Sequence, residues 1–156
     1  MLLLHAAEYV SYLITLLSAA YSDRKSRTIK NKQLFILCAL RFVFLGCFCF
    51  ASRQYALHCL VSSIAALLLM LIITGAALPL TKGSVGAGDF KLLCACGFSL
   101  GIKLWTDSLA VTFALLAAAL IAKHPKGRGA RVPLAPFVFC GVLSASVIWI
   151  VKALLG

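Results

Sequence analysis

The chain has 156 residues, of which 63% are hydrophobic and 12% are charged, and its mean hydropathy is +1.05. A soluble domain has about half apolar and about a quarter charged residues, so this composition excludes a soluble domain and indicates a membrane protein. The net charge of +11 does not indicate nucleic-acid binding here, because most of the chain must lie in lipid.

Six apolar segments are predicted to cross the membrane as α-helices. They cover residues 2–21, 33–51, 56–80, 90–104, 107–122 and 134–155. A crossing takes about 20 apolar residues, so only short loops remain, and residues 1–156 are expected to form a single transmembrane domain. Basic residues follow the first segment and none precedes it, so that segment is expected to be a retained helix rather than a signal peptide.

The fourth segment is unusually short. About 15 residues make a helix of about 22 Å, against a hydrocarbon core of about 30 Å. Either its start lies below the membrane surface, or the helix is tucked inside the bundle. Gly97 and Gly101 form a small-xxx-small pair that would allow close packing against a neighbour.

Most of the 15 basic residues lie at the junctions that follow the first, third and fifth segments. These junctions share one side if all six segments cross the membrane. The positive-inside rule places that side in the cytoplasm and both termini outside, which predicts a multi-pass protein of the cytoplasmic membrane. Attraction to anionic lipid headgroups accounts for the basic charge, with membrane lipids as the partner.

Only four acidic residues are present, and two of them belong to the outer side. Asp107 comes just before an apolar run and next to Trp105, which predicts a helix cap beside an interfacial tryptophan. Glu8 lies within the first segment, where an outer-interface position or a polar contact between helices is expected.

The other two acidic residues, Asp23 and Asp89, are expected to meet the cytoplasmic face. One follows the first segment and the other begins the fourth, so the two carboxylates can converge. Such a pair shares a proton, as in aspartic proteases, where one carboxylate activates water and the other protonates the scissile carbonyl. The alternative is that each pairs with a basic neighbour, Asp23 with Arg24 and Asp89 with Lys91.

Residues 86–92 are Gly-Ala-Gly-Asp-Phe-Lys-Leu, so Asp89 directly follows a Gly-x-Gly element. This stretch resembles the Gly-x-Gly-Asp-x-Lys-Leu signature of the type IV prepilin leader peptidases, which are intramembrane aspartic proteases. Around the first aspartate, Arg27, Ile29 and Asn31 match the family motif, whereas Lys30 stands where the family usually has proline. Residues 132–137, Val-Pro-Leu-Ala-Pro-Phe, are similar to its late Pro-Phe-Gly-Pro-Phe stretch.

This resemblance implies an endopeptidase that removes the short basic leader of prepilin or pseudopilin precursors at the cytoplasmic face. Asp23 and Asp89 would be the catalytic pair. The supporting residues would be Gly86 and Gly88 in the second loop, Lys91 after it, Arg27 and Asn31 in the first loop, and Pro133 and Pro136 at the start of the last helix. Glycines before Asp89 permit positive φ and close backbone approach.

No metal or other cofactor is expected. Larger members of the family carry a zinc-binding insertion with paired Cys-x-x-Cys motifs and also N-methylate the new amino terminus. None of the seven cysteines here is in such a pair, so they are expected to act as small apolar side chains, and methylation is not expected.

Two other functions compete with the peptidase. A small ion or proton transporter would need acidic groups near the midplane and paired interrupted helices. A non-enzymatic assembly factor of a pilus or secretion apparatus would have no need for both aspartates.

Overall fold

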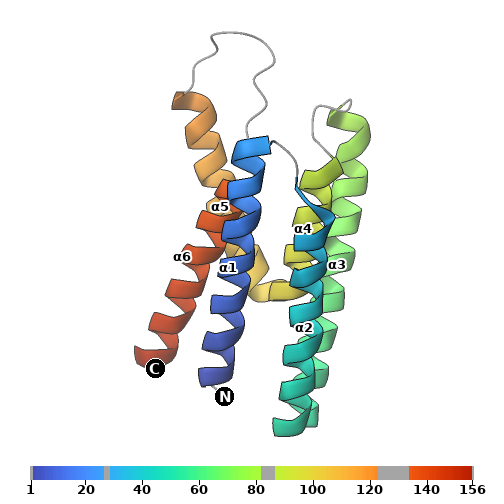
Figure 1. The fold of residues 1–156 in the computed structure, drawn as a ribbon, viewed down its shortest axis with the longest axis vertical. Coiled ribbons are helices and arrows are strands. Elements are labelled where there is room, and N and C mark those ends of the chain that lie inside the picture. The colour runs from blue at the N-terminus through green and yellow to red at the C-terminus, as the bar shows by residue number, and fades with distance from the viewer. Residues whose placement is uncertain (1, 27–28, 82–86, 123–133, 156) are drawn as a thin grey trace.

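The computed structural model describes residues 2–26, 29–81, 87–122 and 134–155. They form six α-helices and, within these ranges, no strand: α1 (Leu2–Ser26), α2 (Asn31–Ala51), α3 (Arg53–Thr81), α4 (Ala87–Leu100), α5 (Ile102–Ala122) and α6 (Ala135–Leu155) (Figure 1). All except α4 are long and apolar enough to cross a membrane. The predicted all-α polytopic membrane fold is therefore confirmed.

Apolar side chains cover both the inside and the outside of the bundle. A helix satisfies its own backbone hydrogen bonds, which is why an apolar segment in lipid becomes one. Phe35, Phe50 and Ile72 are exposed on the outer surface, where lipid would cover them. The interior is built by fully buried side chains from all six helices, including Tyr12, Leu37, Met70, Leu92, Trp105 and Val138.

The helices form two groups of three. α1 and α5 both pack against α6, while α2, α3 and α4 pack against one another. Contacts of α1 with α2, and of α5 with α3 and α4, join the groups. The two groups stand side by side in Figure 1. Asp23 belongs to the first group and Asp89 to the second.

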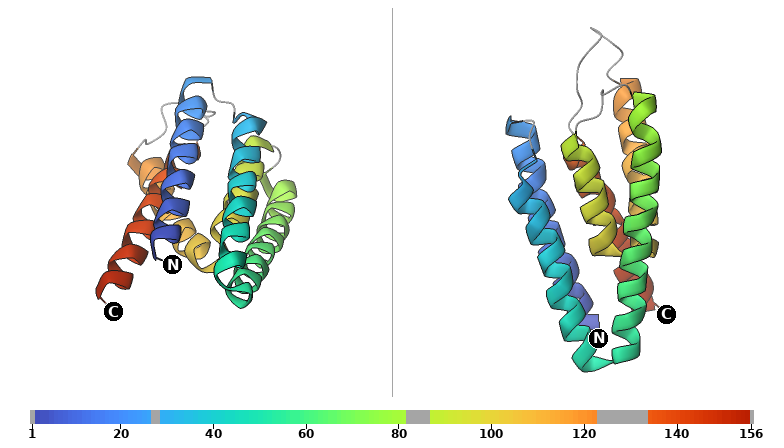
Figure 2. Two further views of the ribbon diagram at one scale, coloured as in Figure 1. Left: turned by 60° about the horizontal axis from the view of Figure 1, so that its bottom comes forward. Right: turned by 90° about the vertical axis from the view of Figure 1, so that its right-hand side faces the viewer.

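The ends of α1, α3 and α5 and the beginnings of α2, α4 and α6 all lie at one end of the bundle, and both termini lie at the other (Figures 1 and 2). This is the arrangement that the charge pattern predicted. The first turn of α4 begins deeper in the bundle than the last turn of α3 (Figure 2). Residues Ala95–Leu100 are also buried, which is the tucked position inside the bundle that was one of the two expectations for this short helix.

The boundary between α4 and α5 differs from the prediction. α4 ends at Leu100 and α5 begins at Ile102, because Gly101 adopts φ +73° in the left-handed region that favours glycine. Ser62 of α3 stabilises this break between the helices, since its hydroxyl oxygen accepts a hydrogen bond from the backbone N–H of Ile102 at 3.0 Å.

The cap predicted at this boundary was wrong. Asp107 lies within the second turn of α5 and is not a cap, because the helix already begins at Ile102. Trp105 is fully buried within the bundle, and its ring nitrogen lies against Gly97. Gly97 supplies the predicted close packing, whereas its expected partner Gly101 ends the helix.

Candidate active site

Asp23 lies inside α1 rather than after it, because α1 continues to Ser26. Its side chain is buried, with 5% of the residue exposed. One carboxylate oxygen, Oδ2, accepts a hydrogen bond from the backbone N–H of Ala135 at 3.2 Å. Ala135 is the first residue of α6, whose N-terminal N–H groups have no partner within the helix. Packing of α1 against α6 thus gives Asp23 a donor from the far end of the chain.

Asp89 lies in the first turn of α4, as predicted, and is half-buried. This turn and the last turns of α1 lie at the same end of the bundle (Figures 1 and 2). A carboxylate in the first turn of a helix interacts favourably with the positive end of the helix dipole. Both aspartates are therefore placed next to a helix N-terminus, Asp23 next to α6 and Asp89 on α4.

Gly88 connects the two aspartate motifs in space. A Cβ built on it would lie 3.7 Å from the Cβ of Ile29, an ordinary contact distance. Gly88 is in α4 and does not use the positive φ that glycine permits, since Gly101 is the one described glycine with a positive φ. Gly86 and Gly83 lie outside the described residues. Contact with Ile29 brings the start of α4 to the segment that precedes α2.

The remaining predicted site residues have different surroundings. Asn31 is exposed as the first residue of α2, and Pro136 is half-buried as the second residue of α6. Both lie at the end of the bundle that carries the aspartates. Lys91 is exposed on α4. Arg27 and Pro133 lie outside the described residues.

The backbone dihedral angles of Lys30 are ones that proline can adopt. It precedes α2 with φ −75° and ψ 129°, and proline restricts φ to about −65 ± 15°. The departure from the family motif at this position therefore leaves the local backbone conformation compatible with the proline that the family usually has.

A family model described as the type IV leader peptidase family matches residues 10–154. The chain belongs to this family. No curated protein and no solved structure matched the chain in the corresponding searches. The match includes both aspartates and at least part of each helix, and it confirms the resemblance found in the sequence. Membership in a leader peptidase family supports a peptidase role in general, with prepilin-like substrates.

Sequence reasoning about this leader peptidase missed the contact between Gln33 and Ser18 and the partner of Glu8. Near the aspartates, the buried Gln33 of α2 donates from Nε2 to the hydroxyl of Ser18 on α1 at 2.9 Å. In the other half of the bundle, Glu8 of α1 forms an ion pair with Arg41 of α2. This ion pair could have been predicted from the sequence, since Glu8 and Arg41 are opposite charges within the first two apolar segments. The contact between helices expected for Glu8 is confirmed.

Proposed function

We propose that this leader peptidase is an intramembrane aspartic endopeptidase, with Asp23 and Asp89 as its catalytic pair. The observation that carries the proposal is the placement of both residues at one end of the bundle, on helices from different groups. A family match that spans both motifs supports it. No other acidic residue among those described lies at this end, because Glu8 is in the first half of α1 and Asp107 is in the second turn of α5.

The chemistry follows from two carboxylates that share one proton. The ionised carboxylate takes a proton from water as its oxygen attacks the scissile carbonyl carbon, and the protonated carboxyl donates its proton to the carbonyl oxygen. Collapse of the tetrahedral intermediate breaks the C–N bond. The first carboxyl gives the proton that it took from water to the leaving nitrogen, and a hydroxyl of the intermediate returns a proton to the second carboxylate. The products are a new carboxylate on the leader and a new amino terminus on the pilin-like protein.

We assign the role of base to Asp23. A carboxylate is a stronger hydrogen-bond acceptor than a carboxylic acid, and Asp23 accepts the N–H of Ala135 at the positive end of α6. The second carboxylate oxygen of Asp23 can then accept from water. Asp89 takes the role of the acid that protonates the carbonyl oxygen.

The recessed start of α4 suits a cut at the edge of a substrate helix. The precursors of this family join a short basic leader to an apolar helix, so their scissile bond lies where lipid meets water. Because α4 begins below the end of α3, Asp89 lies below the outermost turn of the bundle. The charge pattern places this end in the cytoplasm. The proposed substrates are therefore prepilin or pseudopilin precursors, cleaved at the cytoplasmic face of the cytoplasmic membrane.

Co-expression with pilin-like precursors from the same genome tests the proposal. The mass of each precursor's amino terminus is measured with the wild type, Asp23→Asn, Asp89→Asn and Asp107→Asn. We expect leader removal by the wild type and by Asp107→Asn, because Asp107 is exposed on α5 in the other half of the bundle. Neither of the other variants should cleave, although both insert into the membrane. Substantial cleavage by either of them would disprove the aspartate pair.

A further inference from the structure

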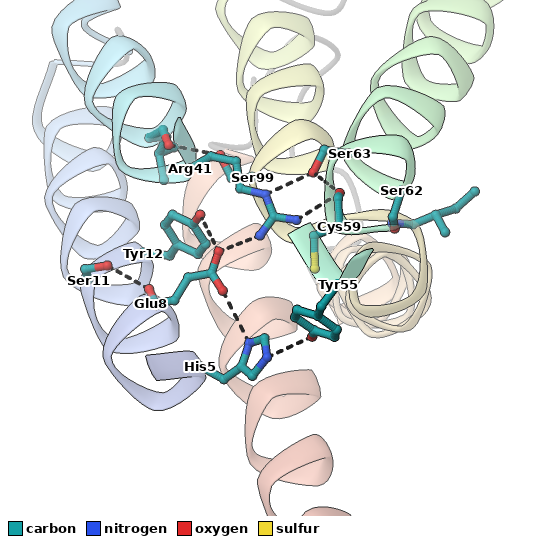
Figure 3. A network of polar contacts seen from close by, with 12 residues as sticks. His5, Glu8, Ser11, Tyr12, Arg41, Tyr55, Cys59, Ser62, Ser63 and Ser99 are labelled. Atoms are coloured by element: carbon teal, nitrogen blue, oxygen red, sulfur yellow. Dashed lines mark hydrogen bonds and ion pairs between the residues drawn. The ribbon is translucent and has the colours of Figure 1, made fainter. Parts of the chain in front are cut away.

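A network of buried polar side chains joins three helices in the half of the bundle that lacks the proposed active site (Figure 3). Its centre is Glu8, of which 1% is exposed. Glu8 Oε1 accepts from the hydroxyl of Tyr12 at 2.9 Å and from Nη1 of Arg41. His5 lies 3.5 Å from the other oxygen of Glu8 through Nδ1. All of these residues except Arg41 are on α1.

Arg41 extends the network from α2 to α3. It is also buried, with 5% exposed. Nε donates to the hydroxyl of Ser63 at 2.9 Å, and Nη2 donates to the carbonyl oxygen of Cys59 at 3.3 Å. A second connection runs from α1 to α3, because the ring of His5 and the hydroxyl of Tyr55 lie 2.8 Å apart. Each nitrogen of the guanidinium therefore has an acceptor on α1 or α3.

Stability alone does not explain a buried ion pair inside the membrane. The desolvation of two charges offsets much of their attraction, and apolar residues of similar volume are often as stable. Charged residues within membrane helices are rare and usually functional. The best-attested structural use of such a pair is to select one register between elements that could otherwise slide.

Register between α1 and α2 is weakly specified without polar contacts. Both helices are apolar over most of their length, and in lipid no hydrophobic force favours one apolar contact over another. The hydrogen bond between Gln33 and Ser18 is one polar contact between them, and the pair of Glu8 and Arg41 is another. The second is charged, deeply buried and tied to α3 as well.

This register bears on the proposed active site. Asp23 is on α1, about 22 Å along the helix axis from Glu8, whereas Asp89 is on α4, which packs against α2 and α3. A slip of α1 by one turn, which keeps the same face of the helix towards α2, would move Asp23 by about 5.4 Å relative to that group. A displacement of about 1 Å can lower a catalytic rate about 100-fold.

We propose that Glu8 and Arg41 are positioning residues, which hold α1 in register on α2 and α3 and thereby set the position of Asp23 relative to Asp89. The proposal rests on the proposed function, since it assumes that these aspartates perform the cleavage. It gives the distant polar network a role in catalysis without contact with the substrate.

The test uses the double variant Glu8→Leu/Arg41→Met, which removes both charges together and leaves neither buried alone. We expect it to insert and to unfold at a temperature within a few degrees of the wild type. With the precursor that the wild type cleaves, kcat should fall at least tenfold while KM changes less than twofold. Activity that falls only in proportion to the folded fraction would show a merely structural role and overturn the proposal.

A second readout measures register directly and needs no peptidase activity. In a background with the native cysteines replaced by alanine, Ser18→Cys/Gln33→Cys reports the native register, and Ser22→Cys/Gln33→Cys reports a slip of one turn. With Glu8 and Arg41 present, a short thiol cross-linker should join only the first pair. Without them, both pairs should react. Exclusive reaction of the first pair in the absence of the network would overturn the proposal.

Glu8→Gln carries the test if the double variant fails to insert. It keeps the volume of Glu8 and an oxygen acceptor for Tyr12 and Arg41, but it removes the charge. We expect kcat to fall at least threefold and the slipped cross-link to form; an unchanged kcat would overturn the proposal. Asp23→Asn is assayed alongside. Cleavage by that variant would refute the proposed function, whatever the cross-links show.

Discussion

The carboxylate of Asp23 accepts a hydrogen bond from the backbone N–H of Ala135, a residue 112 positions further along the chain. This bond links the first-aspartate motif to the stretch around Pro133 and Pro136, which the sequence comparison had connected only by order. It gives the late motif a structural role, because Ala135 begins α6 and its N–H has no acceptor within the helix.

Ala135→Pro should impair cleavage through the loss of this bond. Proline is well tolerated at the first position of a helix, so α6 should still form, but the donor to Asp23 is lost. Hydrogen bonds to charged groups contribute about 1.5–3 kcal/mol, which predicts a decrease in kcat of about 10- to 100-fold. Steady-state kinetics and thermal unfolding check this. Ala135→Ser keeps the N–H and should retain activity, and wild-type kcat in the proline variant would contradict the role.

Lys30→Pro should be compatible with full activity. Lys30 already has φ −75°, within the range of proline, and Ile29 before it lies outside both neighbouring helices. Proline at a compatible position stabilises a protein by about 0.4–1 kcal/mol, mainly by restricting the unfolded chain. The unfolding temperature should stay the same or rise slightly, with unchanged cleavage. A clear loss of either would show that the lysine side chain is required.

Gly141→Ala should destabilise the contact between α5 and α6. A Cβ at this position would lie 2.5 Å from the carbonyl oxygen of Ser108 and even closer to the hydroxyl of Thr112. The carbonyl oxygen of Ser108 is a backbone atom and cannot rotate away as a side chain can. α5 and α6 must therefore separate, at a cost of about 1–3 kcal/mol. Thermal unfolding in detergent measures the loss.

Gly46→Ala is the matched control for that variant. Gly46 is also within a helix, but no atom lies within 4 Å of a Cβ built there. Alanine is favoured over glycine in a helix by about 0.5–1 kcal/mol, so this variant should unfold at the same or a higher temperature. Equal behaviour of the two variants would refute the proposed close approach.

Chelators should leave cleavage unchanged. No group of three or more His, Cys, Asp or Glu side chains that could hold a metal ion occurs in the described part of the chain. Catalysis by a carboxylate pair uses protons and water alone. Purified enzyme treated with EDTA should therefore cleave its precursor at the untreated rate. A loss restored by one divalent metal would point to a site that includes residues beyond those described.

Hydropathy and charge made it possible to predict the helices and which of their termini share one end of the bundle, because both are local properties of the sequence. The exact residues at which the helices begin and end were harder to predict: α1 extends through Asp23 to Ser26, and Gly101 rather than residues near Trp105 separates α4 from α5. The last turn of α1 consists largely of charged residues, and an argument from hydropathy does not include such residues in a membrane-spanning segment. The break between α4 and α5 depends on contact with Ser62 of α3, which no local pattern contains.

The sequence by itself determined the number of helices, the end of the bundle that carries Asp23 and Asp89, and the family, since each follows from apolar length, charge placement or short motifs. Only the tertiary structure decided that Ala135 donates to Asp23 and that Glu8 pairs with Arg41. Those contacts join helices that are far apart in the chain, and in a nearly uniform apolar sequence many pairings are compatible with the same hydropathy. Packing selects among them, because a buried charge or an open helix end must find its partner within the bundle.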